Sequence, residues 1–159
     1  MKKLLSLGVV SLFIGMTAMT LSGNQDRATN DSIQDRFVGA WRLASLETQG
    51  ADGKIHQADS TGLLVFTRDG RMSVQVMERN PQPQTSAAHD QYSRGGYEAS
   101  FGTYQIDEST HTFIYHVEGA LVRTLVGKDL PRAFALSGKQ LIVKSTHPDE
   151  HWKATWEHD

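Results

Sequence analysis

Four polar side chains have types and positions suited to acid–base or anion-binding chemistry. His116 and Glu118 stand two residues apart in an apolar stretch, so in a β-strand they share one face and lie about 6 to 7 Å apart. A carboxylate beside an imidazole orients the ring and raises its basicity, giving a general base near neutral pH. Tyr104 would donate a proton, and Arg132 would bind an anionic group. Convergence in one cavity would make the protein a cofactor-free isomerase, cyclase or hydratase with His116, Glu118 and Tyr104 as catalytic residues.

The elements that must position these residues are short β-strands. From Phe37 onward, short runs of apolar and polar residues are divided by turn residues, and helical periodicity is not sustained. Turns at Arg68-Asp69-Gly70 and Ser137-Gly138-Lys139 favour antiparallel hairpins. The pattern predicts an all-β fold, an up-and-down antiparallel β-barrel of eight to nine strands, with a β-sandwich as the alternative. The expected strands are Val38–Thr48, Leu63–Thr67, Arg71–Glu78, Glu98–Ile106, Thr112–Glu118, Leu121–Val126, Ala133–Leu136, Gln140–Ser145 and Trp152–Glu157.

Two further elements flank or interrupt these strands. Ser32 and Asp35 have the spacing of a helix-capping pair, which predicts a short N-terminal helical turn leading into Phe37. The segment from Arg79 to Gly96 is too long for a hairpin turn, and loops of this length are usually functional or disordered. We interpret it as a lid-like loop over one barrel mouth, with a solvated insertion as the alternative.

Inward-facing side chains decide what a barrel cavity would bind. Trp152, Ala154 and Trp156 form a clearly apolar inner set, whereas the strands around residues 71–78 and 112–118 offer a mixed set on either face. A ligand cavity carries a few placed polar groups among apolar ones. His116 and Glu118 therefore either contact a ligand in the cavity or lie on the solvent-exposed outer face. The candidate ligand-binding residues are Gln75, Met77, Tyr104, Ile114, His116, Glu118, Arg132 and Phe134.

Several segments together carry a resemblance to a known family. Gly39-Ala40-Trp41 looks like the Gly-x-Trp signature that opens lipocalins, and it stands with GLLVFTRDGRMSVQVMER, FGTYQID, TFIYHVEGAL and a closing Trp156-Glu157. Over Phe37 to His158 the chain resembles the bacterial and fungal lipocalin-like domain family. The resemblance implies a short calycin-type barrel with an internal cavity and no agreed activity.

The resemblance also implies fold-closing roles for Gly39, Trp41 and Trp156. Lipocalins commonly set a basic side chain of the last strands over the signature Trp, and the family tends to end in Trp-x-Arg. This chain instead ends in Trp156-Glu157-His158. We therefore expect either His158 or Arg42 to cover Trp41.

The N-terminal segment has the layout of a secretory signal peptide. Lys2 and Lys3 precede an 18-residue, almost uncharged apolar run, and a polar stretch follows. We expect a signal peptide over residues 1–23, a polar leader with the helical turn over 24–36, and the barrel domain over 37–158. The expected location is periplasmic or secreted, and an uncut membrane anchor is the alternative.

Composition excludes several function classes. Without Lys2 and Lys3 the chain has 14 basic and 18 acidic residues, a net charge of about −4, so nucleic-acid binding is not expected. The chain has no cysteine, no Gly-x-Ser-x-Gly elbow and no phosphate-binding glycine loop, so we expect no cofactor. His147 and His151 mimic a helical metal-binding pair, but Pro148 makes the segment a turn, and no metal is expected.

These observations favour an exported protein that binds a small apolar or amphipathic molecule in a barrel cavity. The alternatives are the cofactor-free enzyme described above and a ligand-free interaction module of the cell envelope, since small barrels are sometimes filled by their own side chains. The sequence makes an enzyme the less favoured reading. It indicates neither the ligand nor the oligomeric state.

Overall fold

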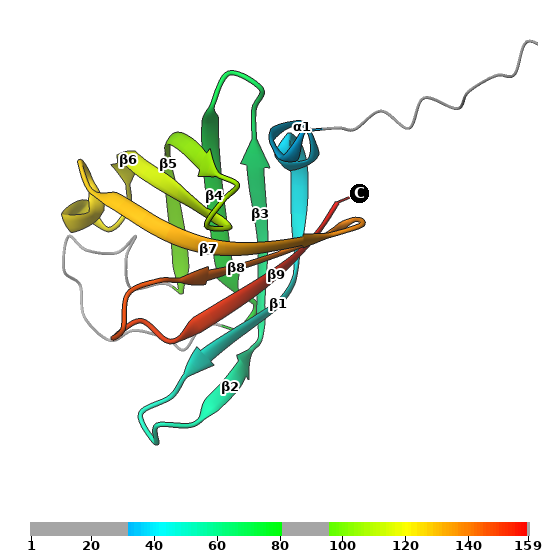
Figure 1. Ribbon diagram of the computed structural model, residues 1–159. Helices are drawn as coiled ribbons and strands as arrows, with labels where there is room; N and C mark the ends of the chain where they lie inside the picture. The colour runs from blue at the N-terminus through cyan, green and yellow to red at the C-terminus, as the bar shows by residue number, and fades with distance from the viewer. Residues whose placement is uncertain (1–31, 81–95, 159) are drawn as a thin grey trace, which may run out of the picture. The chain divides into compact units, whose positions relative to one another are not determined.

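The computed structural model describes residues 32–80 and 96–158, which form two short helices and nine strands (Figure 1). The helices are α1 (Ile33–Phe37) and the 3₁₀-helix η1 (Arg123–Leu125). The strands are β1 (Gly39–Gln49), β2 (Ile55–Ala58), β3 (Ser60–Phe66), β4 (Arg71–Glu78), β5 (Tyr97–Asp107), β6 (Thr112–Ala120), β7 (Asp129–Ser137), β8 (Gln140–Ser145) and β9 (Trp152–His158). The predicted signal peptide, its cleavage site and residues 81–95 of the predicted lid-like loop lie outside the described residues.

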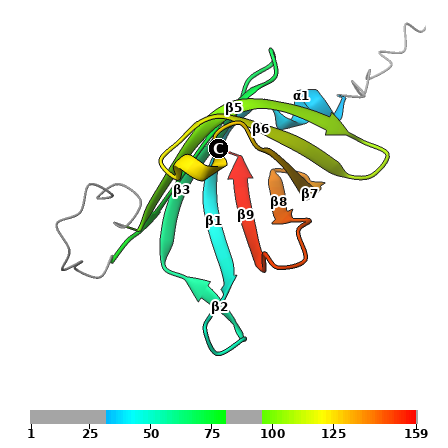
Figure 2. The same cartoon turned by 90° about the vertical axis from the view of Figure 1, so that its left-hand side faces the viewer.

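The strands form a closed barrel. Consecutive strands from β3 to β9 pair antiparallel, and β9 pairs back with β1 from Trp41↔His158 to Thr48↔Trp152. This last pairing confirms the predicted barrel and excludes the sandwich. β2 pairs with the C-terminal part of β1, whose other edge is taken by β9, and the β1–β2 hairpin extends away from the end that carries α1 (Figures 1 and 2).

Both predicted hairpin turns and the helical turn are confirmed. The backbone amide of Asp35 donates to the side-chain oxygen of Ser32 at 3.1 Å, which caps α1. Gly70 and Gly138 take positive φ angles of 83° and 55° in the β3–β4 and β7–β8 turns. Glycine adopts such angles at little steric cost, so these turns set the antiparallel order of the strands they join.

The structure differs from the expected strands at three places. Residues 121–127 form a loop with η1 instead of a strand, because the amide of Gly127 donates to Val117 O and folds the segment back onto β6. β2 was not predicted, since its exposed His56 and Gln57 break any apolar alternation. β7 begins at Asp129, four residues before the expected Ala133, because the polar residues at its start hide the period-two pattern.

One end of the barrel is filled by aromatic side chains around Phe37. The Phe37 ring lies 4.9 Å from the ring of Phe134 and 5.0 Å from that of Phe66, measured between centroids. Tyr104 packs on Phe66 at 4.8 Å, and its hydroxyl donates to Thr67 O at 3.0 Å. Edge-to-face pairs at these distances stabilise a core beyond their burial alone. The end capped by α1 is therefore packed solid.

His158 is the residue that covers the signature Trp41. The two rings meet edge to face with centroids 4.8 Å apart, and the indole nitrogen of Trp41 donates to Phe37 O at 2.8 Å. Arg42 instead pairs with Glu157, and both side chains of that pair are exposed. Gly39 has a φ of 135°, and a Cβ there would overlap the Nε2 atom of His158. Glycine is thus required by both backbone and space.

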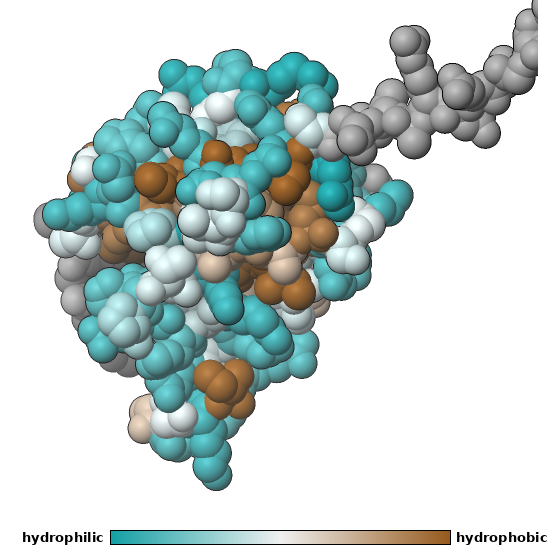
Figure 3. Space-filling view, in the orientation of Figure 1, coloured by the Kyte–Doolittle hydropathy of each residue, from teal (hydrophilic) through white to brown (hydrophobic). Residues whose placement is uncertain are grey.

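Hydrophilic residues cover most of the face seen in Figure 3, and hydrophobic residues show between them. Within residues 32–80 and 96–158, no helix has the length and apolar character needed to cross a membrane.

Candidate functional site

The barrel half opposite α1 contains a cavity of about 390 Å³. Its wall comes from the inner faces of β1 and β3–β9 together with η1. The apolar part of the wall includes Leu46, Val74, Val76, Leu125, Trp152 and Trp156. The polar part consists of Glu98, Ser100, Tyr115, Arg132 and Glu150. An apolar hollow with a few polar groups is the usual form of a small-molecule site.

Strand alternation determines which side chains reach this cavity. On β4, Met72, Val74 and Val76 line it, whereas Gln75 and Met77 belong to the opposite face. Gln75 donates to the Ser73 hydroxyl at 3.0 Å, and Met77 is 43% exposed. The prediction that Gln75 and Met77 face the cavity is therefore wrong. The valines bury more apolar area without the cost of an enclosed amide.

The same correction applies to β6. Phe113, Tyr115 and Val117 are buried, so Ile114, His116 and Glu118 are on the outer face, with Ile114 47% exposed. The physical reason is that enclosing an imidazole and a carboxylate is costly, while turning two aromatic rings inward removes a large apolar area from water. The expectation that Ile114, His116 and Glu118 contact a cavity ligand is thus wrong.

The outward groups have partners of their own. His116 Nδ1 lies 2.7 Å from an Asp129 carboxylate oxygen, and Arg71 donates to Glu118 at 2.9 Å. Both pairs are on the solvent side of the barrel, where the side chains are at least one third exposed. Surface pairs of this kind contribute little to stability. They provide no acid–base group inside the cavity, which removes the catalytic set proposed from the sequence.

Three predicted residues do lie inside the barrel. Tyr104 and Phe134 are buried, but they belong to the aromatic core of the closed end and do not line the cavity. Arg132 lines the cavity. The sequence predicts this position, because Arg132 and Phe134 are two residues apart and share one face of their strand. The structure adds Ser100, Tyr115 and Glu150, which the sequence analysis did not select. The sequence does contain a signal for an inward Tyr115, because this residue shares a strand face with the strongly apolar Phe113 and Val117.

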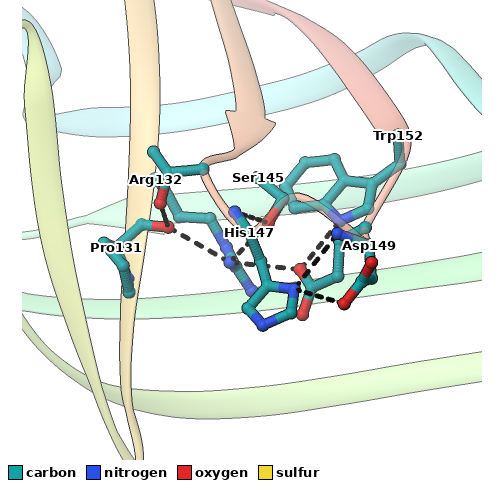
Figure 4. Close-up of polar contacts among 8 residues, drawn as sticks. Pro131, Arg132, Ser145, His147, Asp149 and Trp152 are labelled. Atoms are coloured by element: carbon teal, nitrogen blue, oxygen red, sulfur yellow. Dashed lines mark hydrogen bonds and ion pairs between the residues drawn. The ribbon is translucent and has the colours of Figure 1, made fainter.

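Arg132 is the central polar group of the cavity wall. Its side chain is only 14% exposed, and its guanidinium lies 5.2 Å above the ring of Trp152. One nitrogen, Nη1, donates to Pro131 O at 3.2 Å, to the Ser145 hydroxyl at 3.3 Å and to Glu150 at 3.4 Å (Figure 4). Nε and Nη2 donate to no atom of the described residues. Since a guanidinium has five N–H groups, donors are left for a bound molecule.

Tyr115 offers a second donor. Its side chain is buried, and its hydroxyl makes no hydrogen bond within the part of the chain that the structure describes. Phe113 is opposite Arg132 in the β6–β7 register, which makes Tyr115 and Arg132 diagonal neighbours on the inner face. A buried hydroxyl without a partner is costly. Tyr115 is also part of the cavity wall.

The charges of the site keep these donors in defined states. Burial is the largest cause that raises the pKa of Tyr115. The nearby Ser100 side chain acts in the opposite direction, although its position does not meet the geometry of a hydrogen bond to the Tyr115 hydroxyl, and the phenol is neutral near pH 7. Burial also lowers the pKa of Arg132, while Glu150 and Glu98 act in the opposite direction. The pKa of Glu150 lies below its ordinary value, first through a hydrogen bond with Ser145 and then through Arg132.

The arrangement can hold an acceptor atom of a ligand between Tyr115 and Arg132 with an apolar body against the tryptophans and valines. Among the described residues, no group of His, Asp and Glu side chains is placed to bind a metal ion. None of the histidines in residues 32–80 and 96–158 lines the cavity.

Comparison with known protein families gives a match over most of the barrel domain. The sequence profile described as "Lipocalin-like domain" matches residues 38–158. No curated protein matches the sequence. Among solved structures, the chain is similar to a mutant of the fluorescent protein UnaG, with 12% sequence identity and a TM-score of 0.38, over 79% of this chain and 97% of that one. The extent of the profile match shows that the chain belongs to the lipocalin-like domain family.

Proposed function

We propose that the protein is a carrier or sensor that binds one small apolar or amphipathic molecule in the cavity of the barrel. The observation that carries this proposal is the cavity itself, whose wall is mainly apolar and includes Tyr115, a buried residue whose hydroxyl has no hydrogen-bond partner among the described residues. A barrel whose role were only structural would gain stability from filling this space and from replacing that hydroxyl.

The cavity volume sets the size of the ligand. At about 30 Å³ for each water-sized group, 390 Å³ corresponds to roughly 13 non-hydrogen atoms. A medium-chain or bicyclic molecule has this size. Its apolar body would contact Leu46, Val74, Val76 and Trp156, and burial of that surface would drive binding.

Two neighbouring residues of β4 provide a matched test. Val76 lines the cavity, whereas the adjacent Met77 is on the outer face. Val76→Phe places a ring in the cavity, and Met77→Phe adds the same ring outside. Native mass spectrometry of protein purified from its own host should show one bound organic molecule per chain for the wild type and for Met77→Phe, but not for Val76→Phe.

Two outcomes contradict the proposal. If the wild-type protein has no bound molecule and gains none from a lipid and metabolite extract of its host, it is not a carrier of this kind. If Val76→Phe retains the molecule as well as the wild type does, the ligand is bound elsewhere. Circular dichroism checks that both variants fold.

We propose further that the protein acts after export from the cytoplasm. The support is the positively charged start and the 18-residue apolar run that follows it. Cell fractionation should recover a shortened protein outside the cytoplasm, and N-terminal sequencing should begin near Asn24. Recovery of the full-length chain in the cytoplasm would contradict export, and full-length chain in the membrane would show an uncut anchor.

A further inference from the structure

The polar end of the cavity combines hydrogen-bond donors with an excess of negative charge. The donors are Tyr115 and those N–H groups of Arg132 that have no acceptor in the described part of the chain. Glu98 and Glu150 are also part of the wall. With Arg132 charged and both carboxylates ionised, the wall has a formal charge of −1 before any ligand enters. A ligand must satisfy donors without adding a second unbalanced negative charge.

Glu150 is placed to neutralise the guanidinium. Its Oε2 atom accepts from Arg132 Nη1 at 3.4 Å and from the Trp152 indole nitrogen at 3.4 Å. The carboxylate therefore accepts from one nitrogen of Arg132, while Nε and Nη2 have no acceptor among the described residues. A second carboxylate, brought by a ligand, would meet a guanidinium whose charge is already balanced and would be repelled by Glu150.

An uncharged carbonyl oxygen fits this set of groups. It has two lone pairs and accepts two hydrogen bonds, one from the neutral phenol of Tyr115 and one from Arg132. It brings no net charge to a wall that already includes the carboxylates of Glu98 and Glu150. Ketones, aldehydes and other uncharged carbonyl compounds of about 13 non-hydrogen atoms also match the cavity in volume.

We propose that the cavity selects an uncharged carbonyl compound over the corresponding carboxylate, with Tyr115 and Arg132 binding the carbonyl oxygen and Glu150 acting as the residue that excludes anions. This inference rests on the proposed function, since it names the chemical class of the ligand of the same cavity.

A pair of nearly isosteric probes tests the selection. 2-Acetylnaphthalene and 2-naphthoate each have 13 non-hydrogen atoms by their formulas, the size estimated for the cavity, and they differ by a methyl group in place of a charged oxygen. Isothermal titration calorimetry at pH 7.5 should give an affinity for the ketone at least about tenfold higher than for the carboxylate. In Glu150→Gln, naphthoate affinity should rise by about tenfold, so that the ratio of the two affinities falls.

Glu118→Gln is the matched control. Glu118 also accepts from an arginine, Arg71 at 2.9 Å, but on the outer face of β6. Its replacement removes the same charge from the protein and should leave the ratio of the two affinities unchanged. An equal effect of both substitutions would show that net charge, and not the place of Glu150, sets the preference, and would overturn the inference.

The remaining outcomes separate the inference from the proposed function. If the wild-type protein binds 2-naphthoate as tightly as the ketone or more tightly, the cavity is a binding site and the inference is wrong. If Glu150→Gln leaves naphthoate affinity unchanged, Glu150 does not exclude anions and the inference is also wrong. If neither probe binds, the proposed function fails for ligands of this size, and the inference fails with it.

Discussion

The two buried tyrosines should respond in opposite ways to the loss of their hydroxyl groups. Tyr104 and Tyr115 are both less than 6% exposed, but only Tyr104 has a hydrogen-bond partner, Thr67 O at 3.0 Å. The Tyr115 hydroxyl has none among the described residues. Tyr115→Phe therefore removes an unsatisfied polar atom, whereas Tyr104→Phe removes a satisfied one and leaves a carbonyl without its donor.

The magnitudes follow from the usual cost of each situation. A buried polar group without a partner costs about 1 to 3 kcal/mol, so Tyr115→Phe should raise the free energy of unfolding of the ligand-free protein by about 1 kcal/mol or more. Tyr104→Phe should lower it by about 0.5 to 1.5 kcal/mol. For a barrel of this size, 1 kcal/mol corresponds to a shift of about 3 to 5 °C in Tm.

Urea unfolding at pH 7, followed by tryptophan fluorescence, measures both changes, and calorimetric titration with 2-acetylnaphthalene measures binding. Tyr115→Phe should be more stable than the wild type and bind the ketone about five- to tenfold more weakly. Tyr104→Phe should be less stable, with unchanged affinity. If Tyr115→Phe is destabilised as much as Tyr104→Phe, the Tyr115 hydroxyl has a partner inside the folded protein and is not available to a ligand.

Three other predictions concern the barrel end, the outer face and pH. Gly39→Ala should lower the free energy of unfolding by at least about 1 to 3 kcal/mol, because φ is 135° and the new Cβ overlaps the His158 ring; equal Tm values would contradict this. His116→Gln and Glu118→Gln should each bind the ketone with an affinity within about twofold of the wild type in calorimetry, because both side chains are on the outer face; a larger loss would show that they contribute to binding. The pKa of Glu150 lies below its ordinary 4.5, so stability should decrease as pH falls from about 4.5 through that lowered pKa. Glu150→Gln should make this decrease smaller in urea titrations across pH, and an unchanged slope would show that the group does not stabilise the folded state.

Local patterns in the sequence were sufficient to predict an antiparallel all-β fold. The turn glycines Gly70 and Gly138 and the apolar alternation of β9 act within a few residues, so their structural effect can be read directly from the chain. These patterns do not distinguish a closed barrel from a sandwich with a similar number of strands, and the pairing of β1 with β9 decides between them. The prediction of a strand over Leu121–Val126 is wrong because the apolar residues of this segment are equally compatible with a strand and with the loop that contains η1.

The cavity wall was harder to predict because a one-residue change of phase exchanges the two faces of a strand. On β6 both faces include apolar and polar side chains. The prediction placed the face with the titratable side chains of His116 and Glu118 inside the barrel. The fold instead buries the face with the larger aromatic area, Phe113 and Tyr115. Glu150 was not predictable, because it reaches Arg132 from a loop whose course depends on the assembled barrel.

The central claim is that a small molecule binds inside the barrel and not on its surface. Methyl groups report this directly, since Val74 and Val76 line the cavity while Leu63 and Ile114 are exposed on the outside. NMR spectra of methyl-labelled protein, titrated with 2-acetylnaphthalene, should show shifts of the Val74 and Val76 signals and little change at Leu63 and Ile114. Shifts confined to Leu63 and Ile114, or no shifts at any of the four, would contradict the account.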